Sequence, residues 1–260
     1  MPLTTTTQPV HRFAYRPRVD GPHGRLGVLW FLVAVGACLA GWYAVGLLFT
    51  AVATVAALQS TVAWQQAGRE VDRQVAGAGA AAVGLAALLG TAFAGIAMLA
   101  GVAVTVGAAA LASDRREPIA VRAGLTLRSW VLPALAATAV TAIARLDLGA
   151  AAILLVLVSG YEVGDYLVGT GAAGLVEGPV AGMAAVGVLT FSEAVFQLGP
   201  FDARAAWVFG GLVAVLAPVG APLASALLPG PDARAPALRR LDAWLVVAPV
   251  WCVLLWDYLP

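Results

Sequence analysis

Two long stretches of this 260-residue chain, Gly27 to Gln66 and Gln74 to Ser113, contain no charged residue. A helix needs about 20 apolar residues to cross the ~30 Å hydrocarbon core of a bilayer, so each stretch is long enough for a hairpin of two membrane-spanning helices. A charged side chain at mid-bilayer costs roughly 2.5–3.5 kcal/mol, which explains why charges are confined to the gaps between apolar runs. The sequence therefore predicts an integral membrane protein.

The composition also indicates that lipid is the solvent of this chain. Hydrophobic residues make up 61% of the chain and charged residues 11%, unlike an ordinary soluble domain. The net charge of +1 gives no indication of a nucleic-acid partner, and no basic surface for one is evident. Cys38 and Cys252 both lie in apolar runs, and we interpret them as small buried hydrophobic residues rather than as a disulfide or metal pair.

The apolar runs predict an all-α fold, a polytopic bundle of about nine transmembrane helices forming one domain over residues 26–260. Residues 1–25 are polar and rich in Pro and Thr, and we expect them to form a flexible cytoplasmic tail. The nine expected spans lie at approximately 27–46, 47–66, 77–94, 95–112, 127–144, 148–168, 178–198, 205–228 and 241–258.

The distribution of arginine predicts the orientation of these spans. All fifteen basic residues are arginines, and thirteen fall in segments on one side of the membrane, leaving only Arg145 and Arg204 on the other. Because positive loops stay on the cytoplasmic side, the N-terminus is predicted to be cytoplasmic and the C-terminus outside. The alanine-rich, lysine-free composition is typical of a high-GC bacterial genome and so indicates a bacterial plasma membrane.

Glycines recur at four-residue spacing in the second half of the chain. In lipid, close approach of helix backbones replaces the hydrophobic drive that holds soluble bundles together. We therefore expect the spans after residue 148 to pack as the core, with Gly160, Gly164, Gly178 and Gly182 at helix contacts.

Four acids near the cytoplasmic ends of the predicted spans are the candidate catalytic residues: Glu162, Asp165, Glu177 and Asp242. Intramembrane carboxylates are expensive to bury and so are candidates for function. Among the four, Asp242 and Glu162 are the candidate metal ligands. The alternative is that all four are solvated interfacial acids, and a fifth acid, Glu193, is interpreted as structural.

Two arginine pairs on the cytoplasmic side, Arg115–Arg116 and Arg239–Arg240, are candidates for contact with anionic lipid headgroups or a lipid phosphate. Of the two pairs, Arg239 and Arg240 are the candidate headgroup residues. The alternative is that these arginines only set the topology.

Four segments resemble the motifs of one enzyme family. Residues 159–170 read SGYEVGDYLVGT and residues 176–182 read VEGPVAG, similar to W-G-A-D-T-G-A-Y-x-x-G-R and S-P-x-K-T-x-E-G-x-x-G-G of the phosphatidate cytidylyltransferases (CDP-diacylglycerol synthases). Residues 219–225 (VGAPLAS) resemble that family's L-G-D-L-x-E-S, and residues 238–244 (LRRLDAW) resemble its L-D-R-x-D-S. The matching residues are Gly164, Tyr166, Gly169, Glu177, Gly178 and Gly182, and Glu162 stands where the family has Asp. The resemblance implies a cytidylyltransferase-like fold.

The departures from that pattern fall on the residues that the family uses for catalysis. The resemblance implies cations held by carboxylates of the last two motifs, where this chain has Ala221, Ala224 and Arg239 and keeps only Asp242. One carboxylate cannot hold a two-cation cluster. Residues 159–182 also lack any Arg, Lys or His that could bind a triphosphate. We therefore expect no cofactor and no synthesis of CDP-diacylglycerol.

Three hypotheses for function follow. The leading one is a catalytically degenerate family member, a pseudoenzyme that serves as a scaffold or accessory subunit in membrane or envelope phospholipid metabolism. Its expected partners are the lipid bilayer, a lipid phosphate, and another membrane protein or a second copy of the chain. The first alternative is an active CTP-dependent enzyme in which the four acids surround Mg²⁺. The second is a small transporter whose path Glu162, Asp165 and Glu193 would line, although no repeat of the two halves is found.

Overall fold

The structure is a computed structural model that describes residues 23–112, 117–170, 172, 174–197, 199–230 and 232–259. Within these residues it contains ten helices and no strand, which confirms the prediction of an all-α fold. The helices are α1 (His23–Ala40), α2 (Trp42–Gln66), α3 (Arg73–Leu89), α4 (Thr91–Leu111), α5 (Ile119–Leu146), α6 (Leu148–Gly169), α7 (Glu177–Phe196), α8 (Ala203–Leu227), α9 (Pro236–Arg240) and α10 (Trp244–Tyr258).

Six of these helices, α2, α4, α5, α6, α7 and α8, are long and apolar enough to cross a bilayer. The chain is thus a multi-pass membrane protein by the length and composition of its helices. Helices α1, α3 and α10 are shorter, with 18, 17 and 15 residues. The five-residue helix α9 was not predicted. Most of the predicted tail lies outside the described residues, and α1 already begins at His23 within it.

Two predicted helix boundaries are wrong because they were placed near the middle of each charge-free run. The break between the first two helices falls at Gly41, where φ is 106°, and the break between the next two falls at Gly90, where φ is 155°. Side chains with a Cβ rarely adopt such positive φ values, whereas glycine does so readily. The position of each hairpin turn is therefore set by a glycine, about five residues earlier than predicted in both cases.

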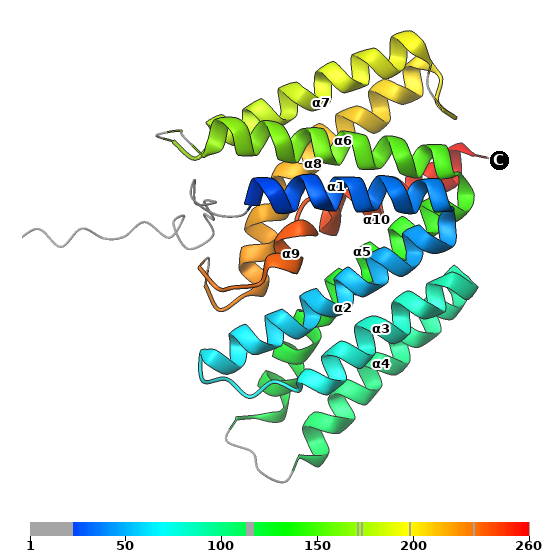
Figure 1. The fold of residues 1–260 in the computed structure, drawn as a ribbon. Coiled ribbons are helices and arrows are strands. Elements are labelled where there is room, and N and C mark those ends of the chain that lie inside the picture. Colours follow the sequence, from blue (N-terminus) through cyan, green and yellow to red (C-terminus); the bar gives the residue numbers. More distant parts are fainter. Residues whose placement is uncertain are drawn as a thin grey trace, which may run out of the picture.

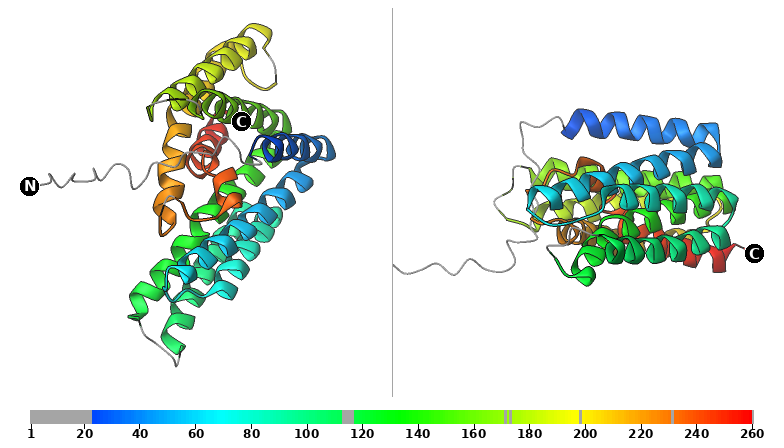
Figure 2. Two further views of the ribbon diagram at one scale, coloured as in Figure 1. Left: turned by 60° about the vertical axis from the view of Figure 1, so that its left-hand side comes forward. Right: turned by 90° about the horizontal axis from the view of Figure 1, so that it is seen from below.

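The helices form two groups with α1 and α10 between them (Figure 1). In one group α2 packs against α3 and α5, and α3 packs against α4. In the other group α6 packs against α7, and α7 against α8. Helix α10 joins the groups by contacting both α5 and α8, and α1 contacts α2 and α6 (Figure 2).

The hydrophobic core extends over both groups. Its largest fully buried side chains include Trp130 from α5 and Trp244 and Trp251 from α10. The indole N–H of Trp251 donates a hydrogen bond of 3.1 Å to the Phe209 carbonyl oxygen on α8. The expectation that the spans after residue 148 form the core is wrong in this respect, since α2 and α5 contribute heavily to the core, while α7 contributes only Val186 to its buried part.

The glycine contacts predicted for the second half are present between α6 and α7. A Cβ added to Gly164 would lie 2.7 Å from the Ala181 carbonyl oxygen, and one added to Gly182 would lie 2.8 Å from the Tyr161 carbonyl oxygen. At Gly178 it would lie 2.9 Å from the Asp165 carbonyl oxygen. These distances leave no room for a side chain, so the two backbones meet directly, as close packing in lipid requires.

Candidate functional site

Three of the four candidate acids lie together with two arginines in a group that we call the carboxylate–arginine cluster: Glu162, Asp165, Arg239, Arg240 and Asp242. Helix α6 supplies Glu162 and Asp165, one turn apart on the same helix, as residues three apart are. Helix α9, which begins with Pro236, supplies both arginines in its last turn. The turn between α9 and α10 supplies Asp242, whose carboxylate accepts a hydrogen bond of 2.6 Å from the Ala243 N–H.

A close backbone contact places this turn against α8. A Cβ added to Gly220 would overlap with the Asp242 carbonyl group, so only glycine fits at this point of α8. The contact brings residues 219–225 and 238–244 side by side, although they are separated in sequence by the α8–α9 connection.

Arg239 is held by the end of α8. Its Nη1 donates to the Ser225 hydroxyl at 2.8 Å and to the Ala221 carbonyl oxygen at 3.3 Å. Ser225 in turn donates to the same Ala221 carbonyl at 2.9 Å. The Ala221 carbonyl oxygen therefore accepts from both Arg239 and the Ser225 hydroxyl, which links α9 to the end of α8.

Arg240 pairs with Glu162 across the α6–α9 contact. The distance from Nη1 to Oε2 is 3.9 Å, and about a quarter of each side chain is exposed, 27% for Arg240 and 22% for Glu162. Glu162 also interacts electrostatically with Asp242 and Asp165, and Asp242 with both arginines. Because charges interact more strongly where water is scarce, the two arginines offset part of the repulsion between these carboxylates.

Asp165 lies at the other edge of the cluster, against the start of α7. Its carboxylate is so close to Gly178 that a Cβ there would overlap with Oδ1. Gly178 is the second residue of α7, and the N-terminus of a helix carries a partial positive charge. The start of α7 therefore places a partial positive charge beside the Asp165 carboxylate.

Glu177 is not part of this arrangement. It is exposed on the first turn of α7, and its Oε1 accepts a hydrogen bond of 3.0 Å from the Gly174 N–H. In the part of the chain that the structure describes, no three His, Cys, Asp or Glu side chains come together in a way that could hold a metal ion. The four predicted acids thus do not form one ring of ligands, and the two predicted headgroup arginines bind atoms of the protein itself.

Glu193, interpreted as structural, lies on α7 and is 5% exposed. Its Oε1 accepts no hydrogen bond from any described residue. The hydroxyl of Thr190, one turn earlier on α7, also has no hydrogen-bond partner among the described residues. Thr190 faces α8, where Gly210 packs directly on it. Glu193 does not join the carboxylate–arginine cluster, which lies at the opposite end of the same helix.

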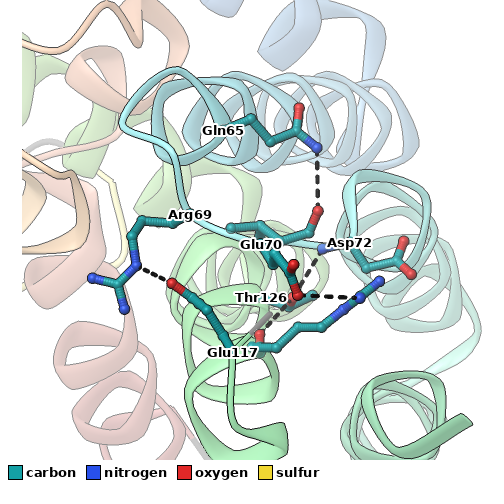
Figure 3. Close-up of polar contacts among 8 residues, drawn as sticks. Gln65, Arg69, Glu70, Asp72, Glu117 and Thr126 are labelled. Atoms are coloured by element: carbon teal, nitrogen blue, oxygen red, sulfur yellow. Dashed lines mark hydrogen bonds and ion pairs between the residues drawn. The ribbon is translucent and has the colours of Figure 1, made fainter. Parts of the chain in front are cut away.

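A second polar cluster, which the sequence analysis missed, connects the ends of α2, α3 and α5 (Figure 3). Arg69 pairs with Glu117 at 2.5 Å, and Arg122 pairs with Glu70 at 3.8 Å. The Asp72 N–H donates to the Thr126 hydroxyl at 3.1 Å. These acids lie outside the apolar runs, so nothing in the sequence distinguished them from ordinary loop acids.

The end of α2 is also anchored to α8. The indole N–H of Trp64 donates to the Leu227 carbonyl oxygen at 3.0 Å, and the Arg128 guanidinium lies 5.3 Å from the centre of the Trp64 ring. Both polar clusters therefore lie at one end of the bundle, which we call the arginine-rich end and which includes the connections 67–72 and 228–235.

Comparison of the chain with protein-family models, curated proteins and solved structures found no match. The class that the fold and these clusters define is a multi-pass α-helical membrane protein with ionic networks at one end of its bundle.

Proposed function

We propose that this protein is a catalytically degenerate relative of the phosphatidate cytidylyltransferases and serves as a scaffold or accessory subunit in the phospholipid metabolism of a bacterial plasma membrane. The proposal combines the resemblance in sequence with the chemistry of the carboxylate–arginine cluster. It assigns that cluster a structural role, the joining of α6, α8 and α9.

The observation that carries the proposal is the position of Arg239. The resemblance equates Ala221 and Arg239 with two acids of the cytidylyltransferase motifs, and here the Arg239 guanidinium donates to the Ala221 carbonyl oxygen at 3.3 Å. A fixed positive charge at this point repels a divalent cation and so works against nucleotidyl transfer. The same guanidinium, with Arg240, neutralises the neighbouring carboxylates, a task that bound cations perform in a metal site.

The membrane topology that accompanies this proposal has nine spans and a cytoplasmic N-terminus. Fifteen residues of helix rise only about 23 Å, so α10 alone falls short of a ~30 Å core. Helix α9 and the turn at 241–243 precede it in the chain, and in this proposal they supply the remaining depth within protein, where a non-helical backbone is tolerated. The arginine-rich end is then cytoplasmic, because positive residues concentrate on that side.

The test is a direct assay of purified protein in nanodiscs that contain phosphatidate. With CTP and Mg²⁺ added, we expect no CDP-diacylglycerol and no heat of CTP binding by calorimetry, while an active phosphatidate cytidylyltransferase in the same nanodiscs turns over. The accessory role predicts that adding this chain changes the turnover or the elution position of the active enzyme. Turnover by this chain alone, abolished by Asp242→Asn, would establish the rearranged enzyme instead.

A further inference from the structure

An open groove at the arginine-rich end lies outside both polar clusters. Its volume is about 310 Å³, and it is lined by Val55, Leu58, Gln59 and Val62 of α2, by Arg73 at the start of α3, and by Arg234 in the connection before α9. No residue of the carboxylate–arginine cluster contributes to it.

The floor of the groove is one stripe of α2. Residues 55, 58, 59 and 62 are spaced so that they share a helix face, and seven residues of helix rise about 10 Å. Val55 is 43% exposed and lies inside the charge-free run of α2, so a bilayer around this helix would surround it with hydrocarbon. The side-chain oxygen of Gln59 accepts a hydrogen bond of 2.9 Å from the Ala237 N–H, which fixes α9 along one wall. An acyl chain lying along α2 would cover this stripe.

Two guanidinium groups flank the shallow end of the stripe. Arg73 and Arg234 are both exposed, and no described acid forms a salt bridge with either. Asp72, the neighbour of Arg73 in sequence, uses a carboxylate oxygen to cap α3 by accepting from the Val75 N–H. The groove therefore presents two positive charges at the level of the membrane surface and an apolar strip below them.

We propose that this groove binds an anionic glycerophospholipid, with its phosphate between Arg73 and Arg234 and one acyl chain along the α2 stripe. Guanidinium groups match phosphate oxygens in geometry as well as in charge. A free phosphate ion would use only the two arginines, whereas a lipid also covers Val55 and Val62. The inference goes beyond the scaffold role and depends only on the chain being a membrane protein, so it can fail or succeed independently of the absence of turnover.

The experiment is native mass spectrometry of the full chain in detergent, titrated with phosphatidylglycerol and, separately, with phosphatidylcholine. We expect preferential binding of phosphatidylglycerol, weakened about fivefold by Arg73→Gln or Arg234→Gln and more than tenfold by the double variant, since a basic residue near anionic lipid contributes about 1 kcal/mol. The matched control is Arg204→Gln, which removes one exposed arginine at the opposite end of the bundle and should leave the affinity unchanged.

A second variant tests the apolar part without changing charge. Val55→Trp fills the deeper end of the groove and should weaken phosphatidylglycerol binding while leaving both arginines in place. Retention of full affinity in the double arginine variant would overturn the proposal. Displacement of the lipid by inorganic phosphate at a concentration comparable to that of the lipid would also overturn the proposal, because the site would then be one for phosphate alone. Equal loss in Arg204→Gln would likewise overturn it, since it would indicate a general charge effect.

Discussion

The backbone contact between α6 and α7 makes a specific prediction about Gly182. A Cβ at this position would lie 2.6 Å from Cδ2 of Tyr161 and 2.8 Å from the Tyr161 carbonyl oxygen, whereas ordinary contacts begin at 3.4 Å. Tyr161 itself is buried, with 6% of its surface exposed, so its ring cannot turn away. The carbonyl oxygen is part of the α6 backbone. Accommodating even alanine therefore requires the two helices to move apart.

Overpacking of this kind costs typically 1–3 kcal/mol in soluble cores, and we expect Gly182→Ala to destabilise the protein by about that amount. For a chain of this size, each kcal/mol lowers the unfolding temperature by roughly 2–4 °C. The measurement is thermal unfolding in detergent, followed by tryptophan fluorescence or circular dichroism. Separation of α6 from α7 should also loosen the glycine contacts on either side, at Gly164 and Gly178.

Gly187 provides the matched control because it lies on the same helix, and a Cβ there would meet nothing within 4 Å. Gly187→Ala should leave stability unchanged or raise it slightly, since alanine favours the helix over glycine by roughly 0.5–1 kcal/mol. Equal unfolding temperatures for Gly182→Ala and Gly187→Ala would refute the reasoning. That result would mean that the two helices do not meet at Gly182.

Three further predictions concern other parts of the bundle. Single cysteines can be placed at Gln66 or Arg204 in a variant that lacks the native cysteines. An impermeant reagent should label the cysteine at position 66 from the cytoplasmic side and the cysteine at position 204 from the outer side. Labelling of position 66 from outside would contradict the topology. Thr126→Val should destabilise the protein by about 1–3 kcal/mol, because it leaves the Asp72 N–H without its acceptor. Thr126→Ser keeps the hydroxyl and should retain most of the stability in a denaturation assay. Trp251→Phe should destabilise the protein by about 1–3 kcal/mol, because it removes the hydrogen bond to α8 and leaves a cavity beside the smaller ring. The unfolding temperature should fall accordingly, and an unchanged value would count against the link between α10 and α8.

The helices were predictable because hydropathy and the absence of charge are properties of the sequence alone. Each long helix corresponds to an apolar run, and the α6–α7 glycines were predictable because their four-residue spacing places them on one helix face. The turns at Gly41 and Gly90 were not, because both runs contain many glycines and nothing in the local pattern singles out the one with positive φ. The short helix α9 contains only five residues, too few for a periodic pattern to be visible.

The candidate site was predictable in part for a similar reason. Glu162 and Asp165 stand out because they interrupt an apolar run, and both join the carboxylate–arginine cluster. The contributions of Ser225 and Ala221 could not be inferred, since binding Arg239 depends on how α8 lies against the α9–α10 turn. That arrangement is tertiary and leaves no local signal. The Arg69–Glu117 pair was missed for the same reason, because it joins two loops distant in sequence.

In the proposed relationship to the phosphatidate cytidylyltransferases, the differences at Ala221, Ala224 and Arg239 are consistent with one another when they are considered as changes of charge. In that proposal, acids lost at positions 221 and 224 alone would leave fewer carboxylates near Asp242, and an arginine gained at position 239 alone would add a positive charge to a cation-binding site. Together they place Arg240 beside Glu162 and both arginines near Asp242, an arrangement that a partly buried site can hold without bound metal. Arginine at this point also secures α9 to α8 through the Ser225 hydroxyl, a bond that a metal-ligating carboxylate would not make in the same way. In the proposed relationship, the pattern is that expected of a site that keeps the packing of α6, α8 and α9 without cation binding.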